Sequence, residues 1–159
     1  MNDGMNVAKQ ATNDIEHWLR LQPETVNIQN VESDPAFQKI DVDLIWMTTT
    51  GNLKVEIKGD RYHKTGNFFF ETHSNFEKGT PGCFLYTQAD WLFYYFVTPR
   101  ILYLLPMPIT KNWFLLNKNR FKERSTRTTV RNHYYTTVGR LVPITEVLKH
   151  IPGIRKVEI

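Results

Sequence analysis

The stretch Asp41-Val-Asp-Leu-Ile-Trp-Met-Thr-Thr-Thr-Gly-Asn-Leu-Lys-Val-Glu-Ile-Lys-Gly-Asp60 predicts a β-hairpin with one apolar and one polar face. We expect its strands at about Lys39 to Met47 and Leu53 to Gly59, joined through Thr48 to Asn52, where glycine and asparagine suit a turn. Alternate residues of a strand share a face. The polar face is therefore expected to carry five ionisable residues: Asp41, Asp43, Lys54, Glu56 and Lys58.

The length of the connecting loop decides which of these side chains lie directly opposite one another. Matching the two apolar faces leaves two registers. A two-residue loop at Thr49-Thr50 sets Asp43 across from Glu56. A four-residue loop from Thr49 to Asn52 sets it across from Lys58, with Glu56 on the diagonal. In both registers these side chains are about 5 to 8 Å apart, within reach of one shared cation.

Two neighbouring carboxylates and a lysine suit the hydrolysis of a phosphodiester bond. The carboxylates repel one another unless a cation lies between them, and Mg²⁺ prefers oxygen ligands. Lys58 would orient or deprotonate the attacking water, or neutralise charge that develops on the phosphate. The alternative is a solvated hairpin face, on which acids and lysines pair across strands without any chemistry.

The rest of the chain predicts a mixed α/β fold. An apolar stripe indicates an amphipathic helix over about Asn6 to Arg20. Apolar alternation and turn residues predict eight further elements, five strands and three helices. These are strands at Thr25 to Val31, Asn67 to Thr72, Trp91 to Val97, Arg100 to Leu105 and Thr128 to Val138, and helices at Cys83 to Ala89, Ile109 to Lys122 and Pro143 to His150.

At Asp41-Val-Asp-Leu-Ile45 and Val55-Glu-Ile-Lys-Gly-Asp60, the chain resembles the PD-(D/E)XK nuclease superfamily, which includes restriction endonucleases and Holliday-junction resolvases. The resemblance covers roughly Asp14 to Val97. It implies a restriction-endonuclease-like core, a mixed central sheet flanked by helices in the order αβββαβ. Val42 stands where the superfamily motif has a proline, and after Gln88 there is no tyrosine of the exonuclease type, because Leu92 occupies that position.

The resemblance also implies the roles of the site residues. Asp43 would be the first metal ligand, Glu56 the second and Lys58 the catalytic lysine, in Mg²⁺-dependent hydrolysis of DNA in which Mn²⁺ would substitute. Asp41 is the alternative to Asp43 as the principal ligand. Two further acids would supply additional ligands, Glu71 at the end of a strand and Glu16 on the first helix.

Positive charge is concentrated in one region. The formal charge of the chain is +4, and seven Lys/Arg residues against one acid lie between Lys111 and Arg131. Such a region attracts a polyanion by releasing condensed counterions; a solvated helix face followed by a basic loop is the alternative. With two cations beside the hairpin, the expected DNA-binding residues are Arg61, Lys64, Lys118, Arg120, Lys122, Arg124, Arg127 and Arg131.

Length and composition predict one domain over residues 1–159, with the basic portion from about 109 to 159 as an extension of the core. Cys83 is the single cysteine, so an internal disulfide is excluded. We find no signal peptide and no run of the roughly 20 apolar residues that a transmembrane helix needs. We therefore expect a cytoplasmic protein of a bacterial or phage-infected cell, with DNA and not a membrane as its partner.

Among nucleases, the short chain favours a structure-directed endonuclease such as a junction resolvase or a phage or repair enzyme. One active site cuts one strand, so cutting two strands predicts a homodimer. A small restriction endonuclease is the alternative within the same class. The alternatives from other classes are a non-catalytic DNA-binding protein on a degenerate nuclease scaffold and a protein-interaction module.

Overall fold

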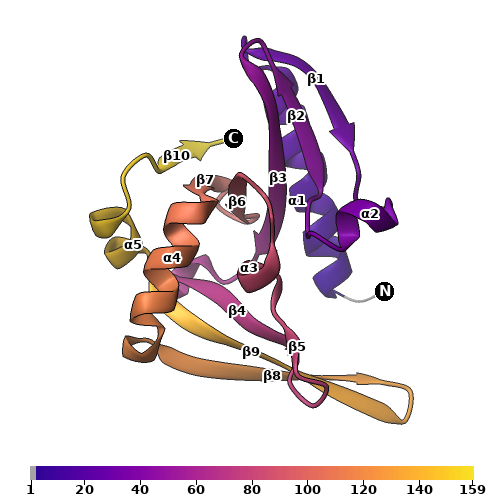
Figure 1. The fold of residues 1–159 in the computed structure, drawn as a ribbon, viewed down its shortest axis with the longest axis vertical. Helices are drawn as coiled ribbons and strands as arrows, with labels where there is room; N and C mark the ends of the chain where they lie inside the picture. Colours follow the sequence, from indigo (N-terminus) through magenta and orange to yellow (C-terminus); the bar gives the residue numbers. More distant parts are fainter. Residues whose placement is uncertain (1–2) are drawn as a thin grey trace. The chain divides into compact units, whose positions relative to one another are not determined.

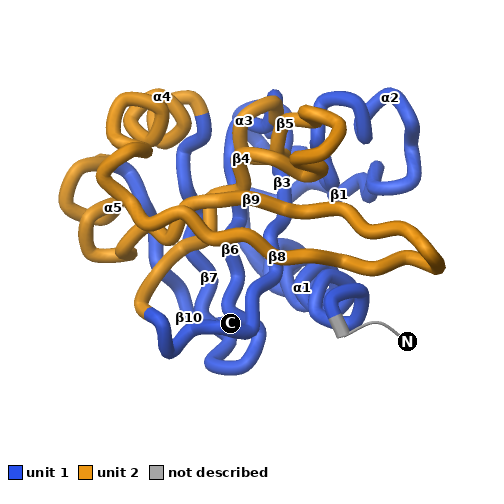
Figure 2. Tube along the Cα trace, turned by 90° about the horizontal axis from the view of Figure 1, so that it is seen from below, with its two compact units in different colours: residues 1–65, 88–107, 153–159 blue, residues 66–87, 108–152 orange. Residues whose placement is uncertain are grey.

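The computed structural model describes residues 3–159, which form a mixed α/β fold (Figure 1). The chain divides into two compact units, coloured separately in Figure 2. Unit 1 contains residues 1–65, 88–107 and 153–159, and unit 2 contains residues 66–87 and 108–152. The basic C-terminal region is thus shared, because residues 153–159 belong to unit 1. Among the described residues, no helix has the length and apolar character needed to cross a bilayer.

Unit 1 is built on a mixed six-stranded sheet with the order β1-β2-β3-β6-β7-β10. The pairing of β3 with β6 is parallel, and the other neighbours are antiparallel. The expected α/β class and mixed central sheet are therefore confirmed. The strands are β1 (Thr25–Asn30), β2 (Leu44–Thr48), β3 (Gly51–Asp60), β6 (Trp91–Phe96), β7 (Ile101–Pro106) and β10 (Arg155–Glu158).

The amphipathic helix expected at the start of the chain is confirmed as α1 (Asp3–Arg20). Its buried residues Ala11, Ile15 and Leu19 lie in one core cluster with residues of the sheet such as Val55 and Phe93. The helix approaches β3 so closely that a Cβ at Gly59 would lie 2.9 Å from the Cβ of Ala11. One face of the unit 1 sheet is thus covered by α1.

Unit 2 is built on an antiparallel four-stranded sheet with the order β5-β4-β9-β8. The ring of Phe70 on β4 stacks on Phe84 of α3 at a centroid distance of 4.1 Å, and both rings meet Phe114 of α4 edge-on. This aromatic core packs two helices against β4. The elements are β4 (Asn67–Asn75), β5 (Thr80–Pro81), α3 (Cys83–Tyr86), α4 (Met107–Asn117), η2 (Lys118–Arg120), β8 (Lys122–Val130), β9 (His133–Pro143) and α5 (Ile144–His150).

The expected strand from Lys39 to Met47 is wrong in its first half, because β2 begins only at Leu44. A short helix, α2 (Pro35–Gln38), precedes it, and Asp34 caps this helix by accepting a hydrogen bond from the amide of Ala36. Asp41 then adopts a φ of 54°, a left-handed conformation that aspartate tolerates better than most residues. This turn replaces the start of the expected strand.

The C-terminal half also differs from expectation. Residues 128–138 are not one strand, because the chain reverses at Arg131 and Asn132 and forms the β8–β9 hairpin. The helix expected from Ile109 to Lys122 ends at Asn117, and the one expected from Cys83 to Ala89 ends at Tyr86. No glycine or proline marks the reversal at residues 131–132, and Asn132 is its one turn-favouring residue.

Candidate metal and nuclease site

Strand β3 separates its apolar and ionisable side chains onto opposite faces of the unit 1 sheet. Val55 and Ile57 face α1 and belong to the core cluster. Glu56 and Lys58 alternate with them and therefore point to the other face. The side chain of Glu56 is buried, with 3% of its surface exposed, whereas Lys58 is partly exposed. A buried carboxylate on a strand needs compensation by hydrogen bonds or a cation.

The hairpin has the shorter of the two expected loops. Thr48 pairs with Gly51 and Leu44 pairs with Val55, which leaves the two-residue loop Thr49-Thr50. Asp43 lies just before β2, and its own amide donates to the carbonyl of Val55 at 2.8 Å. The start of β2 is therefore held against β3 beside Glu56.

The carboxylate of Asp43 turns toward the backbone of β3. Its Oδ2 accepts a hydrogen bond of 2.7 Å from the amide of Ile57. Burial raises the pKa of Asp43 from 3.8 to about 7; the hydrogen bond from Ile57 opposes this, and the negative charges of Asp41 and Glu32 add to it. The acid is thus crowded by other acids, an electrostatic setting that a bound cation relieves.

Asp41 is the aspartate that the structure brings next to Glu56. A carboxylate oxygen of Asp41 lies within 4.8 Å of a carboxylate oxygen of Glu56. Mg²⁺ holds its oxygen ligands at 2.0 to 2.1 Å, so two ligands of one ion are at most about 4.2 Å apart. Small side-chain rotations would bring these two oxygens to one ion, and their oxygen chemistry fits Mg²⁺ or Mn²⁺.

The two additional acids expected as ligands are carried by other elements of the chain. Glu16 is on α1, whose buried residues pack on the Val55 side of the sheet, and its own side chain is half-buried. Glu71 is on β4 in unit 2, where its Oε2 is 4.0 Å from the Sγ of Cys83. Within unit 1, the expected acids that the structure brings together are Asp41 and Asp43 with Glu56 of β3.

Glu32 belongs to the site of unit 1 and was missed in the sequence. Its negative charge raises the pKa of Asp43, and its Oε1 accepts a hydrogen bond of 2.6 Å from Thr12 on α1. The signal was available, because an antiparallel pair of strands brings residues after the end of β1 beside those that precede β2. The amide of Val31 indeed donates to the carbonyl of Asp43 at 2.9 Å.

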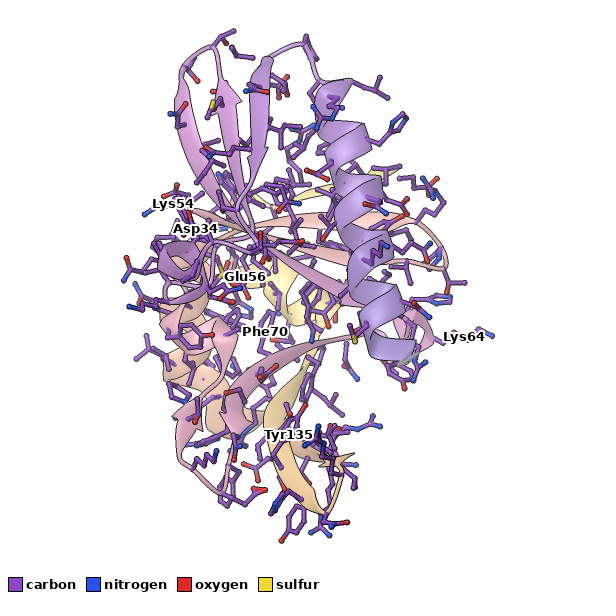
Figure 3. All side chains as sticks on the ribbon, turned by 90° about the vertical axis from the view of Figure 1, so that its right-hand side faces the viewer. Asp34, Lys54, Glu56, Lys64, Phe70 and Tyr135 are labelled. Carbon is purple, nitrogen blue, oxygen red and sulfur yellow. The ribbon has the colours of Figure 1, made fainter. Side chains whose placement is uncertain are left out.

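The two cations expected beside the hairpin lie in the loop after β3. Arg61 donates to the hydroxyl of Tyr62 at 3.0 Å and stacks over its ring. Lys64 lies in the short helix η1 (His63–Thr65), is exposed, and points away from the protein in Figure 3. Both side chains are thus on the surface of unit 1.

The six cations expected in the C-terminal region are all in unit 2. Lys118 and Arg120 lie in η2, where Arg120 also forms an ion pair of 3.7 Å with Glu146. The other four follow the β8–β9 hairpin, with three on β8 and one at its turn: Lys122, Arg124, Arg127 and Arg131. The basic region is therefore mainly an exposed edge strand. It is not the helix face followed by a basic loop that was the alternative expectation.

Comparison with known proteins gives no match: no family model fits the chain, and neither a curated protein nor a solved structure is similar enough to count as one. The functional argument therefore rests on the motif of the first hairpin and on the geometry around Glu56. That geometry offers a carboxylate and an amine on one face of β3 and a second carboxylate, that of Asp41, beside them.

Proposed function

We propose that this chain is a Mg²⁺-dependent DNA endonuclease of the PD-(D/E)XK type that hydrolyses phosphodiester bonds. The observation that carries the proposal is the placement of buried Glu56, with Asp41 within 4.8 Å and Lys58 two residues further on the same face of β3. A solvated polar face does not require a buried carboxylate beside a second one. Such a pair is favourable when a divalent cation is bound.

In this proposal, Glu56 and Asp41 hold the divalent ion, and Asp43 either shares it or keeps the start of β2 in place through Ile57. A bound Mg²⁺ would act as a Lewis acid toward a phosphate oxygen and would lower the pKa of water. The amide of Ile57, the residue that follows Glu56, donates a hydrogen bond that fixes the position of the Asp43 carboxylate relative to β3. Both aspartates thus tie the 41–43 segment to β3.

Lys58 is the proposed catalytic lysine. Its ammonium group lies on the face of Glu56, where it would donate hydrogen bonds to the scissile phosphate as negative charge increases on its oxygens. A deprotonated Lys58 would instead accept the proton of the attacking water. Each role needs the amine next to the ion-binding carboxylates, a separation of two residues along a strand, about 7 Å.

The test is cleavage of branched, linear duplex and single-stranded DNA with Mg²⁺, with Mn²⁺ or with EDTA. We expect cutting that requires the metal and falls at least about 100-fold in Glu56→Gln and Lys58→Ala, since each removes a charge used in the transition state. Lys54→Ala is the matched control, because Lys54 lies on the same face of β3 and is also partly exposed. Equal activity of Lys58→Ala and Lys54→Ala would refute the role of Lys58.

The substrate panel also separates the alternatives. Preferred cutting of branched DNA supports a structure-directed enzyme, and cutting at one sequence in linear duplex supports a small restriction endonuclease. The cationic β8–β9 hairpin favours a second candidate function, a DNA-binding protein without catalysis, which would bind each substrate and cut none. Because one site cuts one strand, we also propose a homodimer, measurable as the molar mass in solution by light scattering.

A further inference from the structure

The end of the β8–β9 hairpin extends past the sheet of unit 2 (Figures 1 and 2). The ladder between β4 and β9 ends at Val138, whereas the ladder between β8 and β9 continues to the pair Val130 and His133. Among the described residues, Thr136 and Thr137 at the base of this extension form hydrogen bonds with residues at and just after the end of β4. The amide of Thr136 donates to Glu77, the hydroxyl of Thr137 donates to the carbonyl of Ser74, and the carbonyl of Thr136 accepts from the amide of Phe76. We call residues 124–137 the hairpin arm; its part beyond the β4 ladder, residues 126–137, has five paired residues on each strand and spans about 17 Å.

The hairpin arm carries positive charge and no acidic residue. Its basic residues are Arg124, Arg127, Arg131 and His133, and no Asp or Glu occurs between residues 124 and 137. The one acid on β8, Glu123, is held in an ion pair of 3.1 Å by Arg140. No residue of β8 is buried, so its arginines are available to a partner.

The arginines are distributed over both faces and the tip of the arm. Arg124 and Arg127 are an odd number of residues apart on β8 and point to opposite faces. The guanidinium of Arg127 lies 4.2 Å from the ring centroid of Tyr134, an arrangement that orients it at little entropic cost. Arg131 lies at the turn with a φ of 56°, where a glycine would be less strained.

We propose that the hairpin arm binds duplex DNA by entering the major groove. A two-stranded ribbon fits this groove, which is about 12 Å wide. Cations on both faces and at the tip would meet phosphates on both walls of the groove, and the threonine hydroxyls would add hydrogen bonds. The inference deepens the proposed nuclease function, on which it rests for the identity of the polyanion, by assigning the surface that holds the substrate.

The charge of β8 disfavours the other occupant of an exposed edge strand, a second copy of the chain. Pairing of two β8 strands would bring like-charged arginines together across the new ladder, which is destabilising. Charged side chains on an edge strand commonly prevent such pairing. A polyanion, in contrast, is attracted by the same arginines and releases counterions when it binds.

The test is binding of a 20-base-pair duplex to the full chain in EDTA, measured by fluorescence anisotropy over a range of salt concentrations. We expect Arg127→Gln together with Arg131→Gly to weaken binding about tenfold or more and to reduce the salt slope by about one for each lost phosphate contact. Arg131→Gly also relieves the backbone at the turn, so thermal unfolding should show that the variant remains folded. Lys149→Ala, an exposed cation on α5, is the matched control and should bind as the wild type does.

Four results would count against the inference. The first is a double variant with the affinity and salt slope of the wild type. The second is a loss of self-association in this variant in place of a loss of DNA binding, which would indicate a second copy as the partner. The third is unchanged binding to a duplex with bulky substituents at C5 of its pyrimidines, because these project into the major groove. Tighter binding of single-stranded DNA that is lost in the same variant also counts against a groove.

The outcomes distinguish the arm from the nuclease. If the wild-type protein binds duplex through the arm but cuts no DNA with Mg²⁺, the arm inference holds and the proposed nuclease function is refuted. If the protein cuts DNA with Mg²⁺ while the arm variants keep their affinity, the nuclease function holds and the arm inference is refuted. Binding is measured without metal, so it does not depend on Glu56 or Lys58.

Discussion

The ionisation of Asp43 is strongly changed by its surroundings in unit 1. Its carboxylate accepts a hydrogen bond from Ile57, which favours the charged form, yet burial and the charges of Asp41 and Glu32 raise its pKa to about 7. Below that pH the protonated acid avoids the repulsion. Near neutral pH, the site therefore exchanges a proton in the range where a bound divalent ion would compete for the same oxygens.

The raised pKa predicts how stability depends on pH in the absence of metal. The pKa of Asp43 is higher in the folded chain than in the unfolded chain, so the folded state binds more protons between about pH 4 and pH 7. This contribution to stability is fully present below about pH 4 and is lost as the pH rises to about 7. We expect Asp43→Asn to lack it, and at pH 8 in EDTA to be more stable than the wild type by about 1 to 3 kcal/mol.

Urea unfolding at pH 5 and at pH 8 measures this difference. The comparison of Asp43→Asn with the wild type removes the contributions of all other titrating groups, and asparagine keeps an oxygen that can accept the Ile57 hydrogen bond. A variant that is less stable than the wild type at pH 8 would contradict the assigned pKa.

At the scale of elements, the contact between α1 and β3 determines where the polar face of β3 points. The helix packs on Val55 and Ile57, and Gly59 continues this face where the helix is nearest. A side chain at residue 59 would push the helix away from the strand. The alternation that directs Glu56 and Lys58 to the other face therefore depends on this apolar contact.

We expect Gly59→Ala to destabilise the chain by about 1 to 3 kcal/mol, the usual result of overpacking. The new Cβ would lie 2.9 Å from the Cβ of Ala11 and 3.0 Å from the carbonyl oxygen of Val7, which belongs to the helix backbone. Thermal and urea unfolding provide the measurement. Ala11→Gly should recover part of the loss in the double variant, and purely additive effects of the two substitutions would show that they do not share this contact.

At the scale of the molecule, the chain passes repeatedly between the two units, and the last seven residues return to unit 1. There β10 forms the edge of the six-stranded sheet by pairing with β7. Val157 and Ile159 pack against the core cluster, and the cations Arg155 and Lys156 lie on the same edge. Unit 1 is therefore completed by residues at both ends of the described chain.

We expect deletion of residues 153–159 to lower the free energy of unfolding by about 2 to 4 kcal/mol. The deletion removes the apolar contacts of Val157 and Ile159 with the core cluster, and it leaves β7 as the edge strand of the sheet. Urea unfolding monitored by circular dichroism measures it. The control is Arg155→Ala, an exposed substitution expected to change stability by less than about 0.5 kcal/mol. Equal stability of the truncated and full chains would show that β10 contributes little to the sheet.

The sequence by itself determined the features that follow from local periodicity. The apolar stripe predicted α1, and strict alternation in Val55-Glu-Ile-Lys58 predicted that Glu56 and Lys58 share a face opposite the core. These predictions are confirmed because a helix and a strand have fixed periods, so the burial of one face follows from the order of residues. The nuclease activity itself stays a proposal.

Only the tertiary structure decided which aspartate lies next to Glu56. The helix α2 and the left-handed conformation of Asp41 end the expected strand early, so Asp41 approaches Glu56 while Asp43 bonds to the backbone at Ile57. The same holds for the β8–β9 reversal at Arg131, which has no glycine to signal it. The turn at Asp41 is held by contacts with residues distant in sequence, such as the hydrogen bond of 2.9 Å from the amide of Gln88 to the carbonyl of Ile40, and no local pattern encodes such contacts.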